Sequence, residues 1–217
     1  MSQIISFIPR LLSGTGITLE LTVVAVVFGL LFGLLLALGR LSKNVVINKF
    51  CWVYIWFFRG TPLLMQLFFI YYAFPLFFNP PLKDLTNVVA GFIAFSLNSA
   101  AYLAEIIRAA IQSIDKGQME ASKALGMTYG QAMMRVIVPQ SYRRLIPPVG
   151  NEFIMMIKDT SLVSAIALPD LMRVTHEIES QQAAWLVYIP SAVIYLLLTT
   201  VFTFIFEKLE KKYSVYE

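Results

Sequence analysis

The chain has 217 residues, of which 58% are hydrophobic and 14% are charged, with a formal net charge of +4. This composition excludes a soluble globular domain. The small net charge, carried by basic residues between apolar runs, argues against nucleic-acid binding. The single Cys51 excludes an internal disulfide, and its distance in sequence from the single His176 argues against a catalytic dyad or metal cluster.

The N-terminal part carries the first expected span. Residues 1–9 hold no cluster of positive charge, so we expect no cleavable signal. Residues 2–13 are expected to lie at the membrane interface, and residues 15–38 to cross the bilayer, which takes about 20 apolar residues. Gly29 and Gly33 lie four residues apart and predict close packing against another helix.

The second span is expected after a break in an apolar, aromatic segment. The break is Arg59-Gly60-Thr61-Pro62. Thr61 is a good helix cap and Pro62 suits a first helical turn, so a new helix is expected to begin there and to span residues 63–78. Asn79-Pro80-Pro81 should end it, because two prolines cannot continue a helix.

Three more spans are expected at about residues 87–111, 145–168 and 185–206, giving five in all. Residues 112–131 form a polar interruption between the third and fourth spans. A second polar loop, residues 170–182, precedes the fifth span and could form an outer gate, receive an external protein, or be a solvated loop.

Five spans put the two chain ends on opposite sides of the membrane, and basic residues decide the orientation. Most of the 17 Lys and Arg residues become cytoplasmic if the N-terminus lies outside and the C-terminus inside. In that orientation the polar segment 112–131 also faces the cytoplasm.

The polar segment predicts a short exposed helix. Residues 116–125 are good helix formers, and Gly126 is a natural stop just past the end. Because no lipid covers this helix, Ala121, Ala124 and Leu125 need a protein partner, as in a helix laid into a groove. The alternative is an ordinary amphipathic loop.

The same region carries a spaced motif that resembles the EAA loop of bacterial ABC importer permeases. Glu120-Ala121-Ser122 is followed by Gly126 and then by Val136-Ile137-Val138-Pro139. Ser122 stands where that family usually has Ala, and two valines stand where it has Ile and Leu. The resemblance runs from about Gly14 to Lys212. Further matches, similar to the polar amino-acid branch with its histidine, arginine and glutamine permeases, are Phe58 to Gln66, Pro139-Gln140, Asn151-Glu152 and Lys158 to Leu162.

The resemblance implies an all-α membrane protein with a type I ABC importer permease core, five transmembrane helices and a cytoplasmic coupling helix. It implies a multi-pass protein of the bacterial cytoplasmic membrane that works with a separate ATP-binding cassette ATPase, a second permease copy and an external amino-acid-binding protein. No phosphate-binding Gly-x-x-x-x-Gly-Lys-Ser/Thr motif is present, so ATP and Mg are expected on the ATPase and no cofactor on this chain. The residues expected to contact the ATPase are Glu120, Ala121, Ser122, Ala124, Leu125 and Gly126.

Polar residues within the spans suggest a substrate cavity, since an ionisable group at that depth costs about 2.5–3.5 kcal/mol and usually faces a path or partner. Asn98, Tyr102 and Glu105 lie on one face of the third span, and Glu152 and Asp159 share a face of the fourth. The candidate substrate-binding residues are Asn98, Tyr102, Glu105, Glu152, Asp159 and Ser161.

Three carboxylates against Lys158 would make this cavity net negative and would favour a cationic substrate such as arginine, lysine or histidine. Three alternatives stay open. Glu105 could pair with Arg108 at i+3, Glu152 could brace the proline-containing backbone, and Lys158 with Asp159 could be a structural hinge.

The predicted function is therefore the transmembrane subunit of an ATP-driven importer of polar, basic amino acids that works by alternating access. One alternative is a permease for glutamine or another polar amino acid. Another is an ion-coupled secondary carrier with Glu105 and Asp159 as ion sites, and a third is a non-transporting scaffold subunit. An enzyme is not expected, since no nucleophile–base pair or metal set is present.

Overall fold

The structure is a computed structural model that describes residues 2–77 and 86–213. Within these ranges the chain is mostly helical and contains no β-strand, as predicted. The expected stop at Asn79-Pro80-Pro81 lies outside the described residues.

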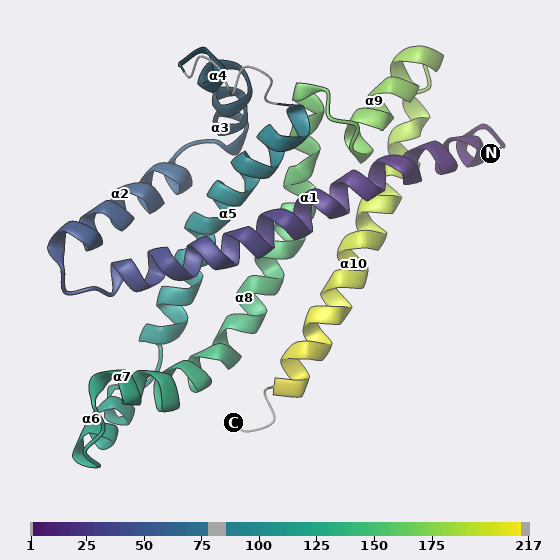
Figure 1. The fold of residues 1–217 in the computed structure, drawn as a ribbon. Helices are drawn as coiled ribbons and strands as arrows, with labels where there is room; N and C mark the ends of the chain where they lie inside the picture. The colour runs from purple at the N-terminus through teal and green to yellow at the C-terminus, as the bar shows by residue number, and fades with distance from the viewer. Residues whose placement is uncertain (1, 78–85, 214–217) are drawn as a thin grey trace.

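The long helix α1 (Ser2–Arg40) crosses the molecule obliquely and packs along α5 (Asn87–Gln112) (Figure 1). Small residues make this contact close, as predicted. A Cβ added at Gly29 would lie 2.7 Å from Ser99 Oγ, and one at Gly33 would lie 3.1 Å from the backbone of Ala100. The α1–α5 pair therefore fits together only because side chains are missing at these positions.

The segment 2–13 does not form a separate interfacial piece; it is the first part of α1. Phe7 and Leu11 are buried against α9 (Leu171–Gln182), in a cluster with Leu171 and Ile178. Phe7 and Leu11 thus pack against protein while Ile8 and Leu12 stay exposed, and the helix extends beyond the expected 15–38.

The expected break lies between α2 (Val45–Gly60) and α3 (Leu63–Phe68), which are bent by 105° relative to each other. The helix then continues as a π-helical turn, η1 (Phe69–Ala73), and α4 (Phe74–Phe77). The expected cap was wrong. Pro62 occupies the N-cap position of α3, and its side chain has no oxygen that could cap the helix. The Thr61 hydroxyl instead donates back to Phe57 O of α2, 2.8 Å away.

Three α-helices and two short helical turns follow α5 in the chain. They are α6 (Lys116–Ala124), α7 (Tyr129–Ala132) with the π-helical turn η2 (Met133–Ile137), and α8 (Val138–Asp159), which ends in the 3₁₀ turn η3 (Thr160–Ile166). The expected polar loop after η3 is instead α9. A short 3₁₀ turn, η4 (Trp185–Val187), leads into α10 (Tyr188–Tyr213).

By length and composition, three of the described helical segments can cross a membrane: Ser6–Arg40, Asn87–Gln112 and Trp185–Tyr213. The bent pair Val45–Gly60 and Leu63–Phe77 makes a fourth if it counts as one span. The expected fourth span, residues 145–168, is not among them, because α8 mixes its apolar residues with charged ones. The main core lies where α1, α5 and α8 meet, around Leu21, Phe95, Leu103 and Ile157.

Candidate functional site

The EAA segment forms α6 at one end of the molecule, where α5 turns back toward α8 (Figure 1). Asp115 caps the helix through Gly117 N at 2.7 Å. Gly126 follows with φ of +81°, a left-handed conformation that favours glycine and ends the helix as predicted. The sequence therefore defines both ends of α6.

Of the six residues expected to contact an ATPase, five are exposed and one is buried. Ser122 is 4% exposed and its hydroxyl donates to Gln118 O within the helix, at 2.7 Å. The exposed residues are Glu120, Ala121, Ala124, Leu125 and Gly126. Leu125, 81% exposed, stands near two further exposed apolar side chains, Tyr129 and Met134. This end thus presents the apolar surface that a partner would cover.

The α2–α3 break is held by two buried amides. Asn98 Nδ2 donates to Gln66 Oε1 at 3.0 Å and to Phe58 O at 3.1 Å. Gln66 Nε2 in turn donates to Thr61 O at 3.0 Å. Asn98 is therefore occupied in fixing the break, which places the end of α2 beside α5.

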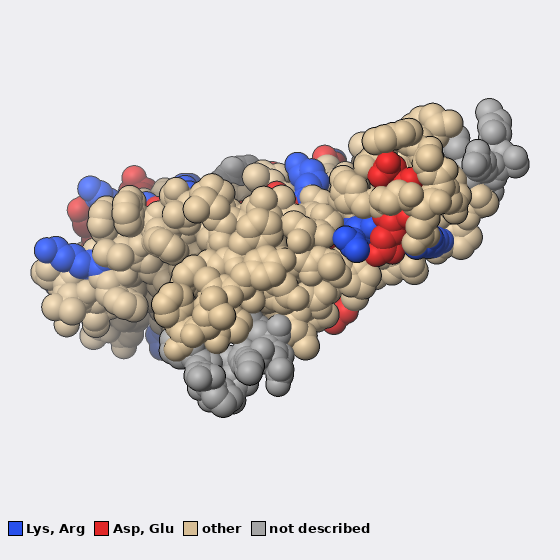
Figure 2. All heavy atoms as spheres, turned by 90° about the horizontal axis from the view of Figure 1, so that it is seen from above, with Lys and Arg blue, Asp and Glu red and all other residues tan. Residues whose placement is uncertain are grey.

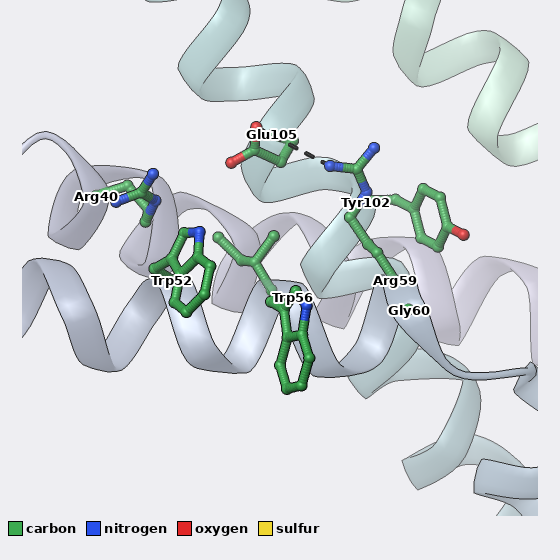
Figure 3. Close-up of a pocket in the computed structure, with 8 residues that line it drawn as sticks. Arg40, Trp52, Trp56, Arg59, Gly60, Tyr102 and Glu105 are labelled. Carbon is green, nitrogen blue, oxygen red and sulfur yellow. Dashed lines mark ion pairs between the residues drawn. The ribbon is translucent and has the colours of Figure 1, made fainter.

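Next to this break, Arg59 reaches across to α5 (Figure 3). Its guanidinium lies 5.3 Å from the ring centroid of Tyr102, and its Nη1 lies 4.0 Å from Glu105 Oε2. Glu105 is also paired on its own helix, because Arg108 Nη2 lies 2.6 Å from the same oxygen and Arg108 Nε donates to Oε1 at 3.0 Å. The i+3 alternative for Glu105 is thus the arrangement found.

Two open cavities, of about 420 and 520 Å³, flank this cluster and share Arg59, Tyr102 and Glu105. The first extends toward Arg40 and α2, and the second toward Arg144 and Pro148 of α8. The Arg59 cluster therefore sits at a junction that small solutes can reach from two sides.

The other two acidic candidates lie on α8. Glu152 is 8% exposed, and Ser99 Oγ of α5 donates to its Oε1 at 3.3 Å. Asp159 and Arg59 are the charged groups whose fields act on Glu152. Asp159 and Ser161 are half-buried, and neither side chain makes a hydrogen bond within the described part of the chain. Asp159 is therefore left without a hydrogen-bond donor.

The expectation of one net-negative cavity built from three carboxylates is wrong for Glu105, since Arg108 and Arg59 neutralise it. In the sequence, Arg59 belongs to the predicted break and to the stretch that resembles the amino-acid permeases, but it is not among the predicted substrate-binding residues. What could have singled it out is its place at the end of an aromatic helix, directly before the Gly60-Thr61-Pro62 break.

At the end of the molecule away from α6, α9 and the start of α1 carry a group of charged residues; Figure 2 shows charged side chains near both tips of the molecule with a largely uncharged surface between them. Arg10 contacts Glu177 at 3.3 Å and Gln181 at 2.8 Å, and Arg173 donates to Glu177 at 3.0 Å. Beneath this surface Asp170 caps α9 through Arg173 N at 2.9 Å, and burial raises the pKa of its carboxyl to about 6.

Comparisons with known proteins identify the family and the overall fold. Residues 29–215 match the family model described as a binding-protein-dependent transport system inner membrane component. The L-cystine transport system permease protein TcyB of Bacillus subtilis is 42% identical, over 97% of this chain and 89% of TcyB. The arginine transport system permease protein ArtQ of the same organism is 38% identical, over 97% and 95%. A crystal structure of an amino acid ABC transporter with histidines has a TM-score of 0.91 at 40% identity, covering 97% of each chain.

Proposed function

Because this chain belongs to the family of binding-protein-dependent transport system inner membrane components, we propose that it is the membrane subunit of an ATP-driven importer for basic amino acids. The family consists of transport components rather than enzymes, so hydrolysis belongs to a separate subunit. The observation that carries the substrate class is the pair Glu152 and Asp159, whose charges no arginine contacts. Lys158, the neighbour of Asp159, is the one adjacent cation.

In this proposal the chain crosses the membrane five times, with α8 and η3 as the fourth span and the α2–α4 unit as the second. Charged residues exclude α8 as a lipid-facing span. In the proposal these residues face protein and the transport path instead. The N-terminus lies outside, and the C-terminus and α6 lie inside. Substrate crosses along a path shared with a second permease copy, since the described residues show no internal two-fold repeat.

The two charges of an amino acid are matched by groups on two helices. Arg59 can pair with the substrate carboxylate through its planar fork, and Tyr102 supports its guanidinium from below. Glu152, Asp159 and Ser161 line up on the α8–η3 side to take the cationic side chain. Asn98 shapes the wall, and Glu105 with Arg108 holds Arg59 in place.

Coupling to ATP hydrolysis is assigned to α6. A rigid helix with an exposed Leu125 and a capped start can enter a groove on the ATPase and pass its movement to α5, which precedes it, and through α7 and η2, which it contacts, to α8. The charged surface of α9 and Arg10 is the natural contact for the external binding protein.

Ligand binding tests the substrate class directly. The intact transporter, purified with its ATPase, is titrated with arginine, glutamine and cystine and monitored by native mass spectrometry. We expect arginine to bind most tightly, and both Asp159→Asn and Glu152→Gln to weaken it by at least about tenfold, the loss of one charged hydrogen bond. Glu177→Gln on the outer surface is the matched control and should bind arginine as the wild type does.

Equal binding of glutamine and arginine, or arginine binding that survives both substitutions, would contradict the basic-substrate proposal. A glutamine or cystine importer of the same family would then stand. An ion-coupled carrier is the second candidate, and it leaves the exposed surface of α6 without a role.

A further inference from the structure

The cavity beside Arg40 holds more positive charge than the surrounding residues neutralise. Arg40 and Arg59 line the cavity with Glu105 as the one carboxylate among its lining residues, and Arg108 already pairs with that carboxylate at 2.6 Å, with Arg59 at 4.0 Å from it. The residues that line this cavity of about 420 Å³ are Arg40, Trp52, Ile55, Trp56, Arg59, Gly60, Tyr102 and Glu105 (Figure 3).

Arg40 itself is incompletely satisfied. One of its Nη atoms donates to Asn48 Oδ1, and Asn48 Nδ2 donates back to Arg40 O at 2.5 Å. Its Nε is buried and is the one such side-chain nitrogen or oxygen in the described residues with no hydrogen-bond partner. A buried, unpaired donor on a cation is costly, and because Arg40 lines the cavity, an anion held there would offset the poorly compensated charge of this side chain.

The mouth of the cavity opens onto an apolar surface. Trp52 and Trp56 of α2 stack with ring centroids 6.1 Å apart and are 48% and 62% exposed. Tryptophan rings of this kind settle at the level of lipid headgroups. The face of α2 beside them carries further exposed apolar side chains, which are Val45, Val46, Phe50, Val53 and Phe57.

We propose that this cavity binds the headgroup phosphate of an anionic phospholipid, whose acyl chains lie along the exposed face of α2. Phosphate oxygens suit guanidinium forks, and basic pockets between membrane helices are recurrent sites for anionic headgroups. An occupant must combine an anion for Arg40 with an apolar tail for α2. A free amino acid supplies the first and not the second.

The cavity shares Arg59 and Tyr102 with the proposed contact for the substrate carboxylate, but neither Glu152 nor Asp159 lines it, so the lipid is tested at Arg40 and Trp52, which the proposed substrate site does not use. The cavity lies at the end of α1 and along α2, toward the end of the molecule where α5 leads into α6 (Figure 1). The assignment of this site to the cytoplasmic leaflet rests on the proposed topology. The proposal that a lipid binds here does not depend on the topology.

The experiment measures lipid retention. The intact transporter in mild detergent is mixed with phosphatidylglycerol or phosphatidylcholine and examined by native mass spectrometry, with soluble glycerol 3-phosphate as a competitor. We expect phosphatidylglycerol to be retained in preference to phosphatidylcholine, and glycerol 3-phosphate to compete poorly. Arg40→Gln should lower the apparent affinity for phosphatidylglycerol about fivefold, the effect of one basic residue near an anionic headgroup, and Trp52→Ala should lower it less.

Two controls separate the site from general charge and from folding. Lys43→Gln removes an exposed cation from the same α1–α2 connection and should leave retention unchanged. Asn48→Ala removes the hydrogen bonds of Arg40 but keeps its guanidinium, so retention should persist.

Equal retention of the two lipids, strong competition by glycerol 3-phosphate, or unchanged phosphatidylglycerol binding in Arg40→Gln would each overturn the proposal. Loss of retention in Asn48→Ala to the same extent as in Arg40→Gln would also overturn it, because the effect would then come from the loop.

Discussion

At the scale of single residues, the polar groups between the helices differ in how completely they are paired. Glu105 has two arginine partners, and Asn98 has two carbonyl acceptors. Glu152 has one hydroxyl donor, and Asp159 has none in the described chain. Because leaving a buried charge unpaired is expensive, the least satisfied carboxylate marks where a cationic ligand gains most.

Arg59 gives the first prediction at this scale. In Arg59→Gln, arginine affinity of the intact transporter should fall by about tenfold or more, because a charge-assisted hydrogen bond to the substrate carboxylate is lost. The arginine affinity of Arg59→Lys should lie between those of the wild type and Arg59→Gln, because lysine keeps the charge but lacks the planar guanidinium. Arg173→Gln, on the outer surface, is the control. Unchanged affinity in Arg59→Gln would remove Arg59 from the substrate site.

Asp170 gives a prediction about pH. Its folded-state pKa of about 6 lies above the value of about 3.9 for a free aspartate, so the folded protein binds the proton more tightly than the unfolded chain does. Stability should therefore decrease as pH rises from about 4 to about 6 and then level off.

The check is thermal unfolding in detergent at several pH values for the wild type and Asp170→Asn. The amide keeps an oxygen that can cap α9 and removes the titration, so the variant should lose less stability than the wild type across this pH interval. Parallel curves for the two proteins would show that Asp170 does not govern this dependence.

At the scale of elements, the closeness of α1 and α5 depends on glycine. Gly29→Ala should destabilise the protein by about 1–3 kcal/mol, since the new Cβ would meet Ser99 Oγ at 2.7 Å and the tight packing cannot relax freely. Gly16→Ala is the matched control in the same helix, where an added Cβ has no neighbour within 4 Å. It should be neutral or stabilising, because alanine favours a helix.

The measurement is the thermal midpoint of both variants in the same detergent. Because Ser99 also donates to Glu152, Gly29→Ala should weaken arginine binding as well. Equal midpoints for the two variants would contradict the close α1–α5 contact.

Gly126 gives the prediction for α6. In Gly126→Ala the left-handed backbone at φ +81° would cost about 1–2 kcal/mol, which should loosen the end of the helix. We expect arginine-stimulated ATP hydrolysis to fall while arginine binding stays unchanged. Gly130→Ala, a nearby exposed glycine whose added Cβ would meet nothing within 4 Å, should leave hydrolysis intact. A fall in binding instead would assign Gly126 to the substrate path.

Sequence reasoning located the third span at α5 and the short polar helix at α6, because hydropathy and helix stops are local properties. It missed the continuity of α1, since Phe7 and Leu11 are buried only once α9 folds against them. It also misassigned Thr61, whose hydroxyl donates to α2 rather than capping α3, across a sharp bend between the two helices. The two partners of Glu105 illustrate this difference. Pairing with Arg108 can be predicted from the i+3 spacing, whereas pairing with Arg59 depends on the bend between α2 and α3.

At the scale of the whole molecule, the charged surface of α9 and the exposed surface of α6 lie at opposite ends, and α8, which carries Glu152 and Asp159, runs between them (Figure 1). Ser99 of α5 donates to Glu152 of α8, so a shift between these two helices would change the pairing of Glu152. In the proposed function, this order places the ATPase contact and the external contact at opposite ends of the subunit.

The most direct test is uptake of labelled arginine into proteoliposomes that contain the intact transporter, its ATPase and its external binding protein. We predict that uptake requires ATP on the side of the membrane that the ATPase faces, persists when ionophores collapse all ion gradients, and is lost in Asp159→Asn. Uptake that proceeds without ATP and stops when the ion gradients are removed would contradict the account and make the chain an ion-coupled carrier.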